Sequence, residues 1–407
     1  MTEVVVVGGG VAGAAAAARL AADGREVLVL EREVEYTDRV RGEGMVPWGL
    51  EAARALGLAD AVLQAPGASC MTTLVAYDEL VAIDDAQRRA RSLAEVLPGV
   101  PGLVAVGHPE LRQALADVAT DAGAVVVRGV EHVEVCPGPA PEVHYTLDGV
   151  RHRVRPRLVV GADGKESVVR RALEVELCST TPTMMLTGML VDDGDVWDRS
   201  AVTIGVHGEN QLYVFPRVGA VRLYVGRMVD AERLSGPERS RRMLDAFRTA
   251  NLPHAEALAD ARPIGPCATF PMTDTWTARP YGPGTVLVGD AAGWSNPVTG
   301  QGLAVAFRDA QVLTELLCER DDWSETTLDR YARERSDRMR RLRFASALTD
   351  LLMAQGVPDR ADRKARMEAL ARRQPELLAA LDAVHRGPWR VSEEAFEPSI
   401  LTAVAAA

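Results

Sequence analysis

The N-terminal stretch constrains this chain most, because two apolar strands flank a glycine-rich turn and a helix. Val4 to Val7 is a β-branched run that is typical of a strand covered on both faces. An alanine-rich segment follows and predicts a helix, which Gly24 ends. Val27 to Leu30 predicts a second buried strand. Strand, helix and strand in this order predict the first unit of a parallel α/β sheet.

The turn between the first strand and the helix has the chemistry of a dinucleotide site. Its glycines are spaced G-x-G-x-x-G, which suits a tight turn, close approach to a pyrophosphate and close helix packing. The helix N-terminus faces the phosphates with N–H groups and a positive dipole end. An acid at the end of the second strand is placed to hold a ribose hydroxyl. We therefore expect dinucleotide contacts from Gly8, Gly10, Val11, Ala12, Gly13, Glu31 and Arg32.

Composition excludes several classes of partner. The 407 residues carry a net charge of −11, which argues against binding to nucleic acid or to an anionic membrane surface. The five cysteines are scattered without C-x-x-C spacing, so we expect neither a metal centre nor a disulfide framework. No apolar run approaches the roughly 20 residues that span a bilayer. The first predicted strand begins close to Met1, so we expect no signal peptide and a cytoplasmic protein.

The nucleotide-type pattern is interrupted and then resumes. Residues 124–127 predict a third short buried strand, and 133–154 predict a small antiparallel meander. Residues 158–170 again indicate a strand, a turn and a helix. From about residue 180 to 275 alternating strands predominate, and the nucleotide pattern returns at Gly284 with a long helix after it. The sequence thus predicts an inserted β-rich layer.

Three separated motifs together carry a family resemblance. They are G-x-G-x-x-G with Glu31, the stretch Gly161-Ala-Asp-Gly-x-x-Ser-x-x-Arg170, and Gly289-Asp-Ala-Ala followed by Pro297-x-x-Gly-Gln-Gly302. In this order they resemble the single-component FAD-dependent aromatic monooxygenases, the para-hydroxybenzoate hydroxylase-like family. The resemblance implies FAD as cofactor, NAD(P)H as co-substrate and O2 as oxidant. It covers residues 1 to about 350.

The resemblance also implies the fold class. We expect an α/β protein with a Rossmann-like, GR2-type FAD-binding fold, an inserted antiparallel substrate sheet and C-terminal helices. The expected division is 1–70, 106–178 and 276–320 for FAD binding, 71–105 and 179–275 for the substrate layer, and 321–407 for the C-terminal helices. The tail beyond about residue 356 lies outside the resemblance, and its helical pattern could serve as a lid, a dimer contact or simple packing.

Further cofactor contacts are implied residue by residue. Asp290 corresponds to the aspartate that binds the ribityl hydroxyls, and the helix opening at Gly300 would face the flavin pyrimidine edge. Arg41 falls in a segment resembling the family's flavin loop, and Arg112 resembles its pyrophosphate arginine. The expected additional FAD contacts are Arg41, Arg112, Val130, Asp163, Asp290, Gly300, Gln301, Gly302 and Leu303.

The substrate is expected between the flavin and the inserted sheet. The period of 2 places Arg222 and Tyr224 on one face of their strand and Val221, Leu223 and Val225 on the other. This segment resembles a strand whose arginine approaches the flavin and whose tyrosine meets substrate, although plain packing is the alternative for each aromatic. Pocket candidates are Tyr213, Phe215, Arg222, Tyr224, Phe270, Met272, Trp294 and Pro297, with no histidine nominated as catalytic base.

The implied activity is hydroxylation of an aromatic or polycyclic small molecule through a C4a-hydroperoxyflavin, by a monomer or homodimer. A related reductase or oxidase, for instance one acting on isoprenoid double bonds, and a flavoprotein that shelters an intermediate are alternatives. A flavin halogenase is disfavoured because no lysine precedes Lys165. The chain departs from the family at Gly293-Trp294, where histidine is common, and at Ala304, where asparagine is usual.

Overall fold

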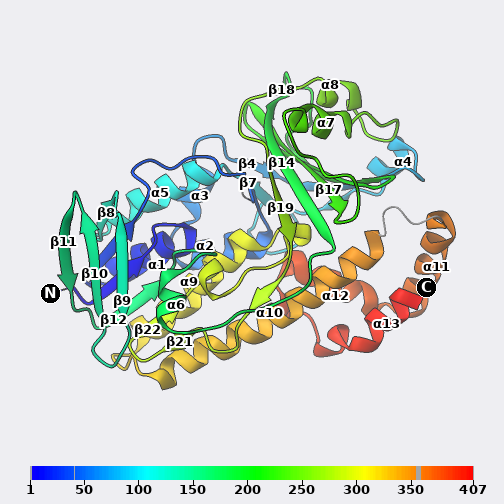
Figure 1. Cartoon of the computed structure of the whole chain (residues 1–407). Helices are drawn as coiled ribbons and strands as arrows, with labels where there is room; N and C mark the ends of the chain where they lie inside the picture. Colours follow the sequence, from blue (N-terminus) through cyan, green and yellow to red (C-terminus); the bar gives the residue numbers. More distant parts are fainter. Residues whose placement is uncertain (1, 41, 354–358, 407) are drawn as a thin grey trace.

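The structure is a computed structural model that describes residues 2–40, 42–353 and 359–406. A parallel sheet with its helices lies at one end of the molecule and a second, larger sheet lies at the other (Figure 1). The long helix α10 (Glu325–Met353) runs beneath the first sheet toward the C-terminal helices (Figure 1).

The parallel sheet confirms the predicted nucleotide-type core. All neighbouring strands pair in parallel except the first two, which are antiparallel. Its order is β21 (Tyr281–Gly282), β22 (Thr285–Leu287), β12 (Leu158–Gly161), β1 (Val4–Val7), β2 (Val27–Glu31) and β8 (Val125–Arg128).

Both faces of this sheet are covered, as the apolar runs predict. Val4 and Val6 pack in one cluster with α1 (Val11–Ala22), α5 (His108–Asp121) and α9 (Gly302–Glu319). Val5 and Val7 point the other way, toward α6 (Val168–Ala172) and a three-stranded antiparallel meander. That meander confirms the prediction for residues 133–154 and contains β9 (His132–Cys136), β10 (Glu142–Leu147) and β11 (Val150–Val154).

The third strand was predicted to be buried, and that prediction is wrong. β8 forms, but Val125 is 59% exposed and the rest of the strand is half-buried. The reason is its position: in the part of the chain that the structure describes, β8 pairs only with β2, so it forms the edge of the sheet. An apolar run alone does not distinguish an edge strand from a central one.

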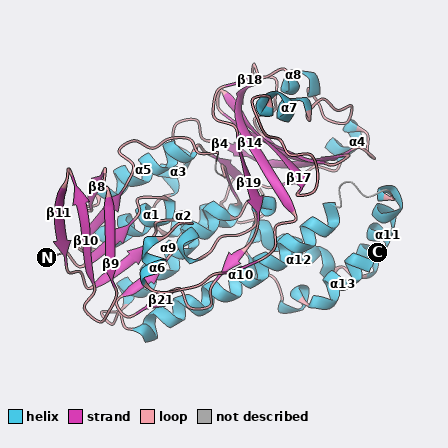
Figure 2. Ribbon diagram, viewed as in Figure 1, coloured by secondary structure: helices cyan, strands magenta, loops and turns pink. Residues whose placement is uncertain are grey.

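The inserted sheet has eight strands and is antiparallel except for the parallel pair β15–β5. Figure 2 shows it as the magenta layer opposite the nucleotide-type core. Its order is β18 (Arg262–Pro263), β14 (Met184–Asp192), β17 (Ala220–Met228), β16 (Asn210–Arg217), β15 (Ala201–His207), β5 (Thr73–Asp78) and β6 (Arg91–Ser92), with β19 (Ala268–Met272) on β14.

The two faces of the inserted sheet have different partners. Val221, Leu223 and Val225 pack in a cluster with α7 (Arg239–Asp245) and α8 (Ala255–Ala259). Tyr224 belongs to a separate cluster on the opposite face. The predicted alternation along β17 is therefore confirmed.

Short elements connect the two sheets. One small sheet contains β3 (Gly44–Met45), β7 (Leu103–Ala105) and β4 (Ser69–Met71), and another pairs β13 (Cys178–Ser179) with β20 (Thr275–Trp276). The short helices in this region are α2 (Pro47–Ala55) and α3 (Ala59–Leu63), whereas α4 (Ile83–Arg88) packs in the cluster of the inserted sheet.

The C-terminal helices pack on α10 and reach the inserted sheet. Their apolar residues form a cluster of their own with the end of α10. Arg360 pairs with Asp78 on β5 at 2.9 Å, and Arg91 on β6 pairs with Asp382 at 2.7 Å. These helices are α11 (Arg360–Arg373), α12 (Glu376–Arg386) and α13 (Pro398–Ala406). Among the described residues, no helix combines the length and apolarity that crossing a membrane requires.

Candidate functional site

The three sequence motifs meet at one edge of the parallel sheet. β1, β2, β12 and β22 run in the same direction, so their carboxyl ends lie side by side. Gly8, Glu31, Asp163 and Asp290 stand at or just beyond these ends. Ligands of open α/β sheets bind at such an edge.

Two glycines of the first motif allow backbone contacts that no other residue permits. Gly8 has φ +102°, and a Cβ built on it would lie 2.5 Å from the carbonyl oxygen of Ala162. A Cβ on Gly13 would lie 2.0 Å from the carbonyl oxygen of Gly8. This packing brings the start of α1 against the strand ends, where no described side chain caps it and its first turn has no acid. The backbone N–H groups at this helix N-terminus fit a pyrophosphate.

Glu31 is held in place at the end of β2. Its buried carboxylate accepts hydrogen bonds from the backbone N–H of Gly9 at 2.7 Å and of Glu33 at 2.8 Å. Arg112 from α5 lies 3.2 Å from the same carboxylate and 2.9 Å from Glu33. The predicted ribose acid and pyrophosphate arginine are thus neighbours. The backbone N–H of Val130 donates to the Glu31 carbonyl at 3.1 Å, while Arg32 is exposed.

Sequence reasoning did not single out Tyr36, which covers this corner. Its ring centroid lies 3.9 Å from the Arg112 guanidinium carbon and 4.3 Å from that of Arg128. Its hydroxyl donates to the Gly9 carbonyl at 3.2 Å. A tyrosine in a charged loop has no motif signal, and only the fold brings the two arginines to it.

Asp163 and Arg170 link the second motif to the third. The Asp163 carboxylate accepts from the Ser167 hydroxyl at 2.5 Å and from the Val168 N–H at 2.6 Å, so it orders the start of α6. Arg170 donates to the carbonyl of Ala291 at 3.1 Å. Here the turn-forming role of Asp163 is visible, and its contact with cofactor stays a prediction.

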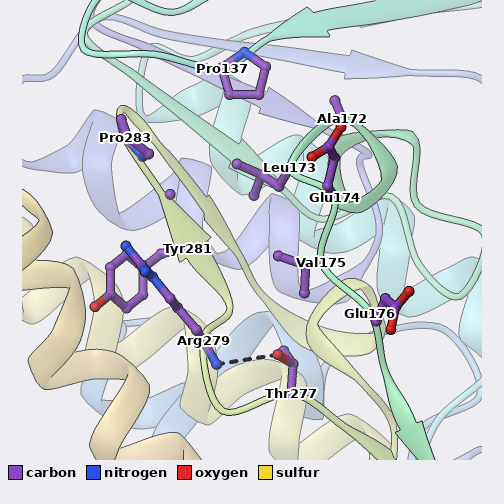
Figure 3. A pocket seen from close by; sticks show the side chains of 11 residues that line it. Pro137, Ala172, Leu173, Glu174, Val175, Glu176, Thr277, Arg279, Tyr281 and Pro283 are labelled. Atoms are coloured by element: carbon purple, nitrogen blue, oxygen red, sulfur yellow. Dashed lines mark hydrogen bonds between the residues drawn. The ribbon is translucent and has the colours of Figure 1, made fainter.

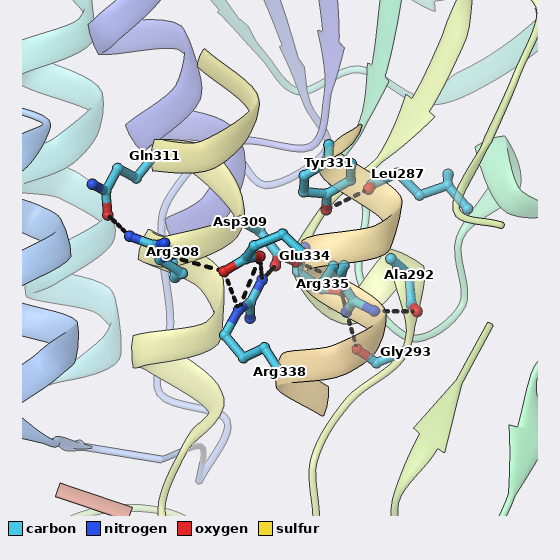
Figure 4. Close-up of polar contacts among 11 residues, drawn as sticks. Leu287, Ala292, Gly293, Arg308, Asp309, Gln311, Tyr331, Glu334, Arg335 and Arg338 are labelled. Carbon is cyan, nitrogen blue, oxygen red and sulfur yellow. Dashed lines mark hydrogen bonds and ion pairs between the residues drawn. The ribbon is translucent and has the colours of Figure 1, made fainter. Parts of the chain in front are cut away.

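The segment carrying Asp290 is clamped from α10, which the sequence motifs did not indicate. Arg335 donates to the carbonyls of Ala292 at 3.0 Å and Gly293 at 2.8 Å (Figure 4). It also donates to Asp309 of α9 at 2.8 Å, and the same carboxylate accepts from the Gly289 N–H at 2.8 Å. Arg338 completes this buried cluster at 2.7 Å from Asp309. Charged residues on a long amphipathic helix predict solvent exposure, so their burial became visible only in the fold.

The second predicted flavin contact is the start of α9. Gly300 has φ +64°, a left-handed backbone conformation that residues with a side chain rarely adopt. Gln301 is fully buried, and its side-chain oxygen accepts from the Trp48 indole at 3.1 Å. Gln301 therefore has a packing role, whereas Gly302 is exposed at the first turn of a helix whose N-terminus no described side chain caps. The backbone N–H groups of this turn are the part that fits a flavin.

Most predicted substrate residues gather on one face of the inserted sheet. Tyr213 and Tyr224 lie opposite each other on β16 and β17, and the Phe215 ring packs edge-on against Tyr224 at 6.1 Å. They share an apolar cluster with Val298, which directly follows Pro297. We call this cluster the aromatic wall; it contains Val40, Met184, Leu186, Tyr213, Tyr224, Met272 and Val298, with Phe215 and Phe270 packed against it.

Two predicted pocket residues have other partners. Arg222 is fully buried and pairs with Glu43 at 2.7 Å and Asp38 at 2.6 Å. Burial raises the pKa of Glu43, although Arg222 and Arg217 oppose this shift. Trp294 donates from its indole to Thr273 at 3.3 Å and is not part of the aromatic wall. Arg41 lies outside the described residues.

A surface hollow of about 470 Å³ lies away from these groups. It borders α6 and β21, with Leu173, Val175 and Tyr281 among its lining side chains (Figure 3). None of the residues predicted for cofactor or substrate lines it. We therefore place the candidate site at the strand ends and the aromatic wall.

Comparison with protein families decides the cofactor. Residues 1–345 match the model of a family described as the FAD binding domain. The chain belongs to this family. FAD is thus the cofactor of this flavoprotein, and the predicted resemblance and fold class are confirmed.

Known proteins resemble most of the flavoprotein. It is 30% identical over 352 residues to digeranylgeranylglycerophospholipid reductase 2 of Methanopyrus kandleri, a match that covers 81% of each chain. It is 29% identical to rifampicin monooxygenase of Streptomyces venezuelae, covering 82% of this chain and 68% of that one. The solved structure of p-nitrophenol 4-monooxygenase from Pseudomonas putida has a TM-score of 0.79 at 21% identity, covering 96% and 99%. These matches support the coarse class of FAD-dependent oxidoreductase.

The Asp290→Ala flavoprotein is expected to purify with little FAD and an unchanged fold. The Asp290 segment is held through backbone carbonyls by Arg335, so removing the carboxyl leaves the segment in place. We expect FAD to bind about tenfold more weakly, which corresponds to about 1.4 kcal/mol. Flavin absorbance per chain and circular dichroism measure both effects. A variant that retains full FAD contradicts the assignment.

Proposed function

We propose that this flavoprotein is an NAD(P)H-dependent monooxygenase that hydroxylates an aromatic or polycyclic small molecule. One observation carries the proposal: the aromatic wall stands against Pro297–Thr299, directly before the helix start that fits the flavin. An apolar wall beside the flavin would position a flat ring and exclude water from it. The bound FAD would supply the oxygen chemistry, with a C4a-hydroperoxyflavin as the assumed oxygenating species.

The proposed sites divide between the two sheets. The glycine motif, Glu31, Arg112 and Asp290 would hold FAD, and residues 179–275 would supply most of the substrate layer. The described sequence has a single G-x-G-x-x-G, so NAD(P)H would bind without a Rossmann unit of its own. We propose that the protein acts in the cytoplasm, because scattered cysteines suit a reducing compartment, and that it is a monomer or homodimer.

Rapid mixing of the reduced flavoprotein with oxygen tests the proposal. With a suitable phenol present, we expect a transient flavin absorbance that differs from both the reduced and the oxidised forms, followed by oxygenated product. NADH and NADPH are compared as reductants of the same preparation. If reoxidation yields only hydrogen peroxide with every phenol offered, the monooxygenase assignment is wrong.

A double-bond reductase is the second candidate, and the similarity to the archaeal reductase favours it. That match covers 81% of both chains, more of the relative than the match to rifampicin monooxygenase does. The candidate is tested without oxygen, by mixing the reduced flavoprotein with an isoprenoid alkene. Flavin oxidation together with saturation of the alkene would establish the reductase and refute the monooxygenase.

A further inference from the structure

One face of α10 borders both parts of the candidate substrate site. Ser346, Asp350 and Met353 are spaced i, i+4 and i+7, so they lie on the same side of the helix. The Ser346 hydroxyl is 3.3 Å from that of Thr299, which follows Pro297 by two residues. Met353 packs against the aromatic wall. Asp350 therefore stands between the loop that precedes the flavin helix and the wall.

Asp350 has one carboxylate oxygen that is bonded and one that is not. Oδ2 accepts a hydrogen bond from the side-chain amide of Asn296 at 3.4 Å. Oδ1 is buried and has no hydrogen-bond partner among the described residues. A buried acceptor without a partner costs about 1–3 kcal/mol, which a hydrogen-bond donor on a bound ligand would offset.

Asn296 holds the first oxygen from a fixed position. Its own N–H donates to Asp274 at 2.9 Å, and its side-chain oxygen accepts from the Val298 N–H at 3.0 Å. Because Asn296 also precedes Pro297, it joins Asp350 to the segment expected beside the reacting ring. The free oxygen of Asp350 is therefore set in a rigid polar frame.

The surrounding charges leave Asp350 without a cationic partner in the described structure. Burial, and then the charge of Asp274, raise the pKa of Asp350 to about 7. The charge of Arg343 opposes the rise in the pKa of Asp274 that burial causes. Its guanidinium carbon lies 4.2 Å from the centroid of the Trp276 ring. Tyr213 feels the charge of Asp350, but its hydroxyl proton is donated to Gln211 at 2.6 Å. The free oxygen of Asp350 therefore receives a hydrogen bond from neither Tyr213 nor Arg343.

We propose that Asp350 is a substrate-binding residue that accepts a hydrogen bond from a hydroxyl or amino group on the substrate ring. This inference rests on the proposed function, because it takes the aromatic wall as the substrate site. A site with a buried acceptor discriminates strongly against the analogue that lacks the donor.

Paired probes test this role by binding alone, without turnover. The FAD-loaded full chain is titrated with 2-naphthol and with 2-methoxynaphthalene, and the flavin absorbance reports binding. We expect the naphthol to bind about tenfold more tightly, as befits a hydrogen bond to a charged acceptor. Its advantage should grow from pH 6 to pH 8, because the ionised carboxylate is the better acceptor.

Two variants separate the role of Asp350 from its neighbours. Asp350→Leu should remove the preference for the naphthol, because leucine cannot accept a hydrogen bond. Asp350→Asn should remove the pH dependence of that preference, because asparagine does not ionise. Asp274 remains in both variants, so the changes report on Asp350. Asp337→Asn, an exposed carboxylate of the same helix, is the matched control and should leave both unchanged. FAD content and circular dichroism establish that each variant is folded.

Three results would overturn the proposal: no binding of the naphthol to the wild type, equal binding of the two probes, or a preference that survives in Asp350→Leu. Failure of the proposed function would look different. A flavoprotein that binds the probes as expected but forms no oxygenated product would retain the Asp350 site and lose the monooxygenase assignment.

Discussion

The Gly13→Ala chain is expected to be destabilised and to lose FAD. Its new methyl carbon would lie 2.0 Å from the Gly8 carbonyl oxygen and 2.9 Å from the Ala162 side chain. The first of these is backbone, so α1 must move away from β1. Overpacking of this kind costs about 1–3 kcal/mol, and it displaces the N–H groups expected to bind the pyrophosphate. Urea unfolding of the apo form and FAD titration measure the two losses.

Gly10→Ala is the matched control within the same motif. A Cβ on Gly10 meets only the Ala162 carbonyl oxygen at 3.9 Å, an ordinary contact, so the apo protein should be as stable as the wild type. The methyl group would nevertheless occupy the space through which the backbone approaches a pyrophosphate. We expect FAD affinity to fall about tenfold or more without loss of stability. Equal FAD affinity in Gly10→Ala and the wild type would refute this placement of the cofactor.

The Arg335→Met chain is expected to be strongly destabilised and to bind FAD poorly. The substitution removes one of the two arginines that pair with the buried Asp309, and it leaves the carbonyls of Ala292 and Gly293 without their Arg335 donor. Breaking a buried ion pair by removing one partner costs about 3–5 kcal/mol. FAD should be lost as well, since the same side chain fixes the segment that carries Asp290. Thermal unfolding and flavin content are the measurements.

Arg333→Met on the same helix is the control for this change. Arg333 is exposed and, among the described residues, pairs only with Asp329 one turn away, so its loss should change stability by no more than about 0.5 kcal/mol. Similar effects of the two substitutions would contradict the clamp.

The pH dependence of stability provides an independent check on the clamp. Burial alone would raise the pKa of Asp309, but Arg335 and Arg338 outweigh burial and lower it. A carboxyl group whose pKa is lowered in the folded state stabilises the protein at pH values above its unfolded-state pKa of about 3.9. This stabilisation is lost as the pH falls from there through the lowered, folded-state pKa. The wild type should therefore lose stability on acidification more steeply than Arg335→Met does.

The cofactor side of this protein could be predicted because its signals are local. Gly8 and Gly13 occupy positions where a side chain would collide with backbone, and such a constraint selects glycine at fixed spacing. The alternation along β17 likewise follows from the geometry of a strand, and it places Tyr224 opposite Val221 and Val225 as predicted. Constraints between residues that are close in the chain therefore appear as motifs in the sequence.

Residues that act across the fold left no such pattern. Arg335 and Asp350 lie on one helix whose charges indicated a solvated surface, yet one clamps the Asp290 segment and the other borders the aromatic wall. The ion pairs of Arg222 likewise had no sequence signal, because its partners Glu43 and Asp38 lie in a loop far earlier in the chain. The partners of a buried charge depend on which distant elements pack against it.

The dinucleotide-binding core was predictable from the amino-acid pattern, because steric and hydrogen-bond requirements of a turn act between neighbouring residues. Three other features became visible in the packed fold: β8 is an edge strand, Arg335 clamps the third motif, and Asp350 keeps a free oxygen beside the aromatic wall. Each of these depends on contacts between elements far apart in the chain. Burial and pairing are properties of the packed fold, and no single segment encodes them.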